Sequence, residues 1–98
     1  MTERGRILVV DDEPSARSAL QQLLSLEGYE VESAADGRAA LLKLGSFEPD
    51  VVLTDLKMPG IDGLTLVEQG RADSPHTAFL VMTAFGGTAG VFFVMASL

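Results

Sequence analysis

Three aspartates are the side chains of this sequence best placed to do chemistry together. Asp11 and Asp12 directly follow an aliphatic run at residues 6–10, and Asp55 ends a second apolar run at residues 50–55. Three unpaired carboxylates about 5 Å apart would repel one another by roughly 3 kcal/mol per pair at an effective dielectric constant of about 20. A bound cation or partial protonation would relieve that repulsion. Because the set holds no His or Cys, it favours a hard ion, Mg²⁺ before Mn²⁺ or Ca²⁺.

A purely structural role is the alternative for the first two aspartates. Asp11, Asp12 and Glu13 precede Pro14, and negative charge and proline are both favoured at the start of a helix. One capping carboxylate would be enough for that role. Two adjacent aspartates at one strand end, with Asp55 at another, therefore favour a metal site over a helix cap.

The elements that must position these residues alternate between β-rich runs and helical periodicity. Continuous aliphatic runs are typical of strands buried on both faces of a parallel sheet. Glycines after the apolar periodicity predict helix ends at Gly28 and Gly45, and weak alternation over residues 29–35 indicates a strand at the sheet edge. The predicted strands are residues 6–10, 29–35, 50–55 and 77–82. Three helices are predicted: one begins at Pro14, a second follows an N-cap at Asp36, and a third spans residues 64–69.

This order of elements, βαβαβαβ, predicts an α/β fold with right-handed crossovers, a parallel sheet and helices on both faces. In such sheets ligands bind beyond the carboxyl ends of the strands. If the first strand lies between the second and the third, Asp11, Asp12 and Asp55 converge at that edge of the sheet.

Size and composition narrow the class of protein. The 98 residues carry seven Lys and Arg against fourteen Asp and Glu, a net charge of −7, and no cysteine. We expect a single domain over residues 1–98, without disulfides, thiolate metal ligands or a cysteine nucleophile. The acidic balance argues against direct nucleic-acid binding. The first residues show no signal-peptide pattern, so the cytoplasm is the expected location.

The end of the chain is unusual because it carries almost no charge. Every Asp, Glu, Lys and Arg lies at or before Asp73, and the sole imidazole, His76, is interpreted as solvated and without a functional role. Residues 83–90 are predicted to form a glycine-rich loop, and residues 91–96 are short, apolar and β-prone. A membrane anchor over residues 78–98 is the alternative, but the interrupting glycines and the lack of flanking Lys or Arg oppose it.

Three motifs, in order, closely resemble the receiver domain of two-component response regulators, and the second and third are similar to the NtrC class. They are Val9-Val10-Asp11-Asp12-Glu13-Pro14, Leu53-Thr54-Asp55-Leu56-Lys57-Met58-Pro59-Gly60-Ile61-Asp62-Gly63 and Val81-Met82-Thr83-Ala84. The resemblance covers residues 6–86, and residues 87–98 diverge. It implies a flavodoxin-like, doubly wound parallel sheet with strand order 2-1-3-4, whose fifth strand is missing or replaced by residues 91–96.

The resemblance also implies a phospho-accepting signalling domain rather than an enzyme, with slow self-dephosphorylation as an accompanying activity. Asp55 would take a phosphoryl group from a sensor histidine kinase or a phosphotransfer protein. Asp12, Asp11 (directly or through water), Asp55 and the backbone carbonyl of Lys57 would hold Mg²⁺. Thr83 would be the switch hydroxyl, which turns toward the phosphoryl group.

The sequence departs from the family where a fifth strand, a final helix and a phosphate-binding lysine are expected. Its only lysines are Lys43 and Lys57, so no residue can be given the role of that lysine. Slower phosphorylation, or a weaker link between phosphorylation and the switch, is the expected result. Residues 91–96 either replace the missing strand or pack against a second molecule, which would give a homodimer through the apolar C-terminal segment.

Two further functions stay open. One is a pseudo-receiver, a phosphorylation-independent interaction or dimerisation module that keeps the acidic pocket. The other is a hydrolase of the haloacid dehalogenase type, which uses an aspartyl nucleophile beside Mg²⁺. That class needs Asp-x-Asp after its first strand, whereas Asp11 and Asp12 are adjacent, so the receiver interpretation is preferred.

Overall fold

Strands and helices alternate along the chain until two strands follow one another at its end. The computed structural model describes residues 5–85 and 90–95, with side chains over residues 5–82. The elements are β1 (Arg6–Val10), α1 (Pro14–Leu26), β2 (Glu30–Ala34), α2 (Gly37–Phe47), β3 (Val51–Asp55), α3 (Gly63–Asp73), β4 (Ala78–Phe85) and β5 (Gly90–Met95).

The strands form one sheet in the order β2-β1-β3-β4-β5. The first four run parallel, so the predicted order 2-1-3-4 is confirmed. β5 takes the fifth position beside β4, but it runs antiparallel to it. Parallel neighbours need a crossover of about a dozen residues or more, whereas residues 86–89 are all that separates β4 from β5. The short connection therefore dictates a hairpin.

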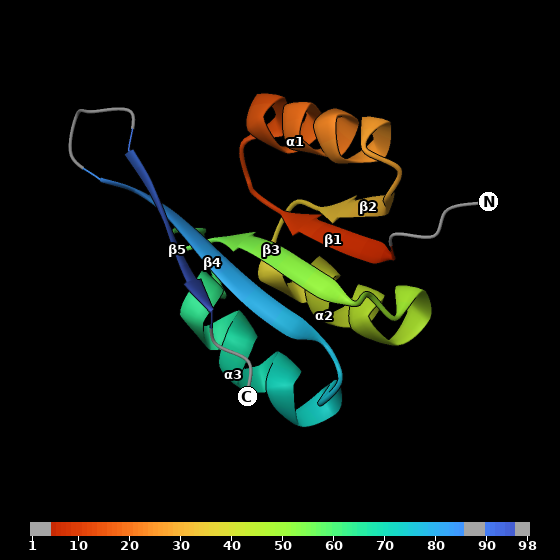
Figure 1. Ribbon diagram of the computed structural model, residues 1–98. Coiled ribbons are helices and arrows are strands. Elements are labelled where there is room, and N and C mark those ends of the chain that lie inside the picture. Colours follow the sequence, from red (N-terminus) through yellow and green to blue (C-terminus); the bar gives the residue numbers. More distant parts are fainter. Residues whose placement is uncertain (1–4, 86–89, 96–98) are drawn as a thin grey trace.

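Helices cover the two faces of the sheet unequally. Figure 1 shows α1 on one side of the sheet and α2 and α3 on the other. The main core lies between the sheet and the α2–α3 pair, because alternate strand residues point to that side. Its buried members are Leu8, Val10, Ala34, Ala40, Leu44, Phe47, Val52, Met58, Leu66, Val67, Phe79 and Val81.

Two predicted helix starts, at Pro14 and Asp36, and the predicted helix end at Gly28 are confirmed. Pro14 occupies the first turn of α1, and the Asp36 side chain accepts a hydrogen bond from the Ala39 amide at 2.8 Å at the start of α2. Gly28 follows the last turn of α1 with φ +99°, a left-handed conformation that favours glycine.

Three predicted boundaries are wrong. α2 continues through Gly45 to Phe47, and its C-cap is Glu48, which adopts a left-handed conformation with φ +53°. α3 extends well past residues 64–69 to Asp73. Residues 83–85, predicted as the start of a glycine-rich loop, belong to β4 because they pair with β5.

Gly70 lies in the part of α3 beyond the predicted range, and it allows the helix to approach the core closely. An added Cβ there would lie 2.7 Å from Cζ of Phe79 and 3.1 Å from Cδ1 of Leu44. The glycine is therefore the place where α3 approaches the core closely, and the Phe79 ring, which is fully buried, fills the space of the missing side chain.

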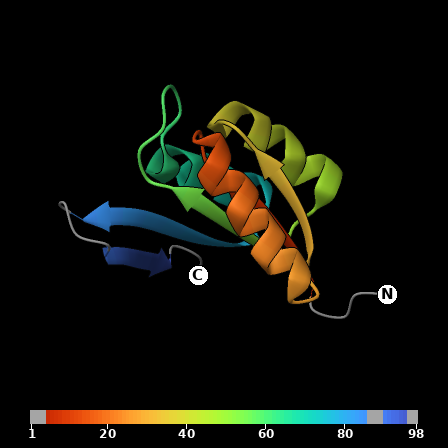
Figure 2. The same cartoon turned by 90° about the horizontal axis from the view of Figure 1, so that it is seen from above.

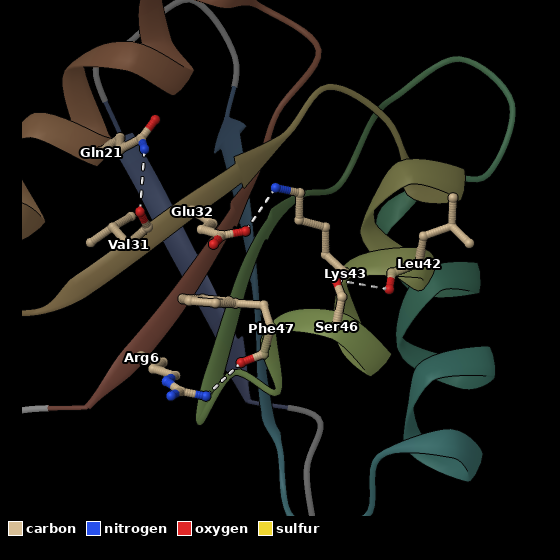
Figure 3. A network of polar contacts seen from close by, with 8 residues as sticks. All are labelled: Arg6, Gln21, Val31, Glu32, Leu42, Lys43, Ser46 and Phe47. Carbon is tan, nitrogen blue, oxygen red and sulfur yellow. Dashed lines mark hydrogen bonds and ion pairs between the residues drawn. The ribbon is translucent and has the colours of Figure 1, made fainter.

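β2 lies at the edge of the sheet, as its weak alternation predicted. Polar contacts tie it to the helices on both sides (Figure 3): Gln21 Nε2 donates to the Val31 carbonyl at 3.3 Å, and Lys43 Nζ contacts Glu32 Oε1 at 2.7 Å. Charged side chains on an edge strand discourage pairing with a further strand.

Within the parts of the chain that the structure describes, no helix combines the length and the hydropathy that crossing a membrane requires.

Candidate functional site: an acidic cluster at the carboxyl ends of β1 and β3

The register of the two central strands brings the predicted aspartates together. Val10 pairs with Thr54 across the parallel β1–β3 ladder. The next residues, Asp11 and Asp55, therefore leave the sheet side by side at the carboxyl ends of their strands. This is the edge of an open α/β sheet at which ligands bind.

Oxygens of three carboxylates meet at this point. One oxygen each from Asp11, Asp12 and Asp55 lies within 4.8 Å of the others, with Asp11 and Asp55 partly buried and Asp12 exposed. His and Cys take no part in the cluster. The donor set fits a small divalent cation, because Mg²⁺ prefers oxygen ligands and a few carboxylates usually suffice to bind it.

Glu13, and not Asp11 or Asp12, is the N-cap of α1, so the two aspartates remain available to the cluster. Glu13 Oε1 accepts the Ser15 amide at 2.6 Å and is the N-cap of α1. Asp11 Oδ1 accepts the Glu13 amide at 3.0 Å, which fixes the orientation of its carboxylate. The Asp11 backbone is held as well, because Arg17 Nη1 donates to its carbonyl at 2.8 Å.

The environment of Asp55 disfavours its charge. Partial burial raises the pKa of the Asp55 carboxyl above its usual value, and the negative charge of Asp11 raises it further, with a smaller effect from Asp12. The nearby backbone N–H groups of Leu56 and Lys57 favour the charged carboxylate and oppose the rise in pKa. A cation in the cluster would favour the ionised form, since an opposite charge lowers the pKa of a carboxyl group.

The loop after Asp55 is anchored to its neighbours through the backbone. The Leu56 amide donates to the Met82 carbonyl on β4, and the Gly63 amide donates to the Leu56 carbonyl, both at 2.9 Å. An added Cβ at Gly63 would collide with the Asp55 carbonyl oxygen and lie 3.0 Å from Leu56 Cα. Only glycine lets α3 begin so close to the end of β3.

The remaining predicted site residues lie around this cluster. Asp55 pairs with Met82 in the β3–β4 ladder, so Thr83 occupies the next position along β4; its side chain lies outside the described part of the structure. The side chain of Lys57 is exposed and lines a hollow with Met58 and Asp62.

Lys43 and His76 lie away from the acidic cluster. Lys43, the other lysine, pairs with Glu32 at the β2 edge. His76 is exposed and lines a hollow with Asp50 and Asp73, next to the residues where β3 and β4 begin rather than where they end.

Sequence reasoning missed two residues that shape the site. Gly63 ends the second motif, and its close approach to the Asp55 backbone has no signal in the local sequence. Arg17 was overlooked; its spacing of six residues from Asp11 places it one turn into α1, where it can reach back to the end of β1.

Comparisons with known proteins agree on one family. The family model described as "Response regulator receiver domain" matches residues 7–96. Regulatory protein AtoC of Escherichia coli is 40% identical over 85 residues, which are 87% of this chain and 18% of AtoC. Response regulator MprA of Mycolicibacterium vanbaalenii is 47% identical over 79 residues, which are 81% of this chain and 34% of MprA. The chain thus spans about a third or less of these relatives.

A solved structure shows the same similarity. The response regulator TrrA from Thermotoga maritima, in complex with Mg²⁺-BeF, is 41% identical and superimposes with a TM-score of 0.78. The match covers 88% of this chain and 72% of the TrrA chain.

Proposed function

The chain belongs to the response regulator receiver domain family, with the NtrC-class character that its motifs predicted, and from this membership we propose that it accepts a phosphoryl group on Asp55. The donor is the phosphohistidine of a sensor histidine kinase or a phosphotransfer protein. Receiver domains of this family act in two-component signalling and are not enzymes in the usual sense. The observation that carries the proposal is the convergence of Asp55 with Asp11 and Asp12 within 4.8 Å.

The proposed step is an in-line phosphoryl transfer. A carboxylate oxygen of Asp55 attacks the phosphorus, the bond between phosphorus and the donor's imidazole nitrogen breaks, and the electron pair stays with that nitrogen, which is then protonated. The product is an acyl phosphate on Asp55. Because the negative charge of Asp11 and Asp12 opposes the approach of a phosphoryl group, the step needs a compensating cation.

We propose that the cation is Mg²⁺, held by Asp11, Asp12, Asp55 and the backbone carbonyl of Lys57. When bound, Mg²⁺ neutralises carboxylate and phosphoryl oxygens. The carboxylate cluster and the Mg²⁺-BeF complex of the similar TrrA structure support this assignment. Slow self-dephosphorylation would return Asp55 to the free carboxylate.

Thr83 is proposed as the switch hydroxyl. Its backbone lies one residue beyond Met82, the β4 partner of Asp55, so this position of β4 is next to the end of the acceptor strand. The segment that follows it would carry the change in conformation to a partner. We further propose that residues 1–98 act as one receiver-like domain, that it works in the cytoplasm, and that it does not itself bind nucleic acid.

A second candidate function is a pseudo-receiver that works without phosphorylation. Two observations favour it: no lysine follows Lys57 in the sequence, and the strand after β4 returns antiparallel to it. Such a module would bind its partners whether or not Asp55 is phosphorylated, and it would form a homodimer through its apolar C-terminal segment.

One experiment separates the two. The chain is incubated with acetyl phosphate and Mg²⁺, its intact mass is followed, and its size is measured with and without beryllofluoride. A phospho-acceptor gains the mass of one phosphoryl group and loses this ability in Asp55→Ala. A pseudo-receiver gains no mass and keeps the same size in both conditions.

A further inference from the structure

The side of α1 that faces the sheet begins with a charged residue. The partly buried residues of α1 are Arg17, Leu20, Gln21 and Leu24, and the rest of the helix is exposed. Residues at this spacing lie on one side of a helix, and α1 contacts β1 and β2. The arginine needs an explanation, because a charged side chain loses solvation where it is partly buried.

Arg17 reaches back to the loop between β1 and α1. Its Nη1 donates to the Asp11 carbonyl at 2.8 Å, in a partly buried contact. Figure 2 shows the start of α1 on the same side of the molecule as the loop that follows β3, so this contact is made at the edge of the acidic cluster. The ion pairs within the described part of the chain involve other residues. Arg17 therefore acts on the cluster through the Asp11 backbone and not as an ion-pair partner of its carboxylates.

Three hydrogen bonds hold Asp11 in place. Its amide donates to the Ala34 carbonyl at the end of β2 at 3.2 Å, its Oδ1 accepts the Glu13 amide at 3.0 Å, and its carbonyl accepts the Arg17 side chain. The partners in the first two bonds are backbone groups. The bond from Arg17 is thus the one of the three that a substitution of the partner residue removes.

The Asp11 carbonyl belongs to the peptide unit that joins the two adjacent aspartates. This unit is planar and contains the Cα atoms of both Asp11 and Asp12. A hydrogen bond that fixes the carbonyl therefore orients the plane from which both side chains leave. Asp12 is exposed, so its placement beside Asp55 in the cluster depends on this peptide unit more than on packing.

We propose that Arg17 is a positioning residue of the cation site, which orients the Asp11–Asp12 peptide so that both carboxylates meet one ion beside Asp55. The inference rests on the proposed Mg²⁺ site and adds to it a residue that sets its affinity. Groups that hydrogen-bond to metal ligands typically contribute about 10- to 100-fold to metal affinity.

A positioning role also implies a preference between ions. Mg²⁺ requires nearly octahedral geometry, whereas Ca²⁺ accepts a variable number and arrangement of oxygen ligands. Loss of Arg17 should therefore weaken the binding of Mg²⁺ more than that of Ca²⁺. A purely electrostatic role predicts the opposite sign, because removal of a positive charge near an acidic site strengthens the binding of every divalent cation.

The test is the Kd of Mg²⁺ and of Ca²⁺ for the full chain, measured by isothermal titration calorimetry. Arg17→Met keeps an unbranched apolar stem and loses the donors, and it should raise the Kd for Mg²⁺ about 10-fold or more and that for Ca²⁺ by less. Arg17→Lys, which keeps a charged donor of different geometry, should restore part of the Mg²⁺ affinity.

The matched control is Arg71→Met, which makes the same change of charge at an exposed arginine in the last turn of α3. It should leave both Kd values within about two-fold, because solvent and salt screen a charge at that distance from the cluster. The amide resonance of Asp12 gives a second measurement in the metal-free chain, since this N–H belongs to the peptide that Arg17 holds. The resonance should shift in Arg17→Met and stay in place in Arg71→Met.

Several outcomes would overturn the inference. An unchanged Kd for Mg²⁺ in folded Arg17→Met means that Arg17 does not position the ligands, and tighter binding of both ions means that only its charge matters. Equal weakening for both ions, without recovery in Arg17→Lys, indicates a general disturbance of the loop. If Arg17→Met does not fold, Arg17→Lys decides: the ratio of the Mg²⁺ and Ca²⁺ Kd values should rise, and an unchanged ratio contradicts the positioning role.

Failure of this inference is distinguishable from failure of the proposed function. A wild-type chain that binds neither ion would overturn the positioning role together with the cation site. A chain whose Mg²⁺ affinity depends on Arg17, but which gains no phosphoryl group from acetyl phosphate, would overturn the acceptor role of Asp55 and leave the positioning role intact.

Discussion

Asp11 and Asp55 leave neighbouring parallel strands side by side, and their carboxylates lie within 4.8 Å of each other. The charge of Asp11 adds to partial burial in raising the pKa of Asp55. Asp55 is therefore held in an environment where its negative charge costs free energy until a cation or a proton offsets it. This relationship links the fold, the stability of the chain and its proposed chemistry, and it leads to measurable consequences.

Asp55→Asn should stabilise the metal-free protein. Removing the charge at neutral pH relieves repulsion of about 1 kcal/mol, the water-screened Coulomb energy of a carboxylate pair at this separation. The folded-state pKa of Asp55 is raised above the ordinary value of 3.8. The ionised Asp55 therefore lowers the stability of the fold above the raised pKa, and this destabilisation disappears as the pH falls below 3.8. Urea unfolding in EDTA at pH 7 and at pH 3.5 measures the gain and its loss.

The control for this prediction is Glu68→Gln, which removes an exposed carboxylate of α3 that is not part of the cluster. It should change the free energy of unfolding by no more than about 0.5 kcal/mol at either pH. Equal gains in the two variants would mean that overall net charge, and not the cluster, is responsible.

Mg²⁺ should stabilise the wild-type chain against heat. At a concentration 100 times its Kd, a ligand that binds only the folded state adds about 2.7 kcal/mol, which for a domain of this size corresponds to a rise in Tm on the order of 10 °C. Asp11→Asn and Asp12→Asn should lose most of the rise. A rise equal to that in NaCl of matched ionic strength would contradict the site, and Glu68→Gln should respond like the wild type.

Gly63→Ala should damage both stability and the acceptor. The added methyl group would collide with the Asp55 carbonyl oxygen, and overpacking of this kind typically costs about 1 to 3 kcal/mol. Displacement of the Asp55 backbone should also slow phosphorylation. Gly45→Ala is the matched control, since its Cβ meets nothing within 4 Å inside α2, and it should stabilise by about 0.5 to 1 kcal/mol. If the two variants are equally stable, the close approach at Gly63 is of no consequence.

The sequence predicted the parts of the fold that depend on local physics. The aliphatic run of β1, the proline that opens α1 and the Asp36 cap each have a short-range signal, and the structure confirms them. The convergence of Asp11, Asp12 and Asp55 was predictable because parallel strands bring their carboxyl ends to one edge.

The errors arise where tertiary contacts decide. The helix predicted over residues 64–69 continues past Gly70, where the Phe79 ring occupies the space that a side chain would need. Gly63 shows no sign in the sequence of its approach to the Asp55 backbone. The antiparallel return of β5 follows from a short connection in a segment whose sequence departs from the family, so the resemblance could not predict it.

The central claim, that Asp55 is the phosphoryl acceptor, is tested most directly by intact-mass measurement after incubation with phosphoramidate and Mg²⁺. The wild-type chain and Glu68→Gln should each gain one phosphoryl group, the gain should vanish on treatment with hydroxylamine, and Asp55→Asn should gain nothing. A gain that persists in Asp55→Asn, or no gain in the folded wild-type chain at saturating Mg²⁺, would contradict the account.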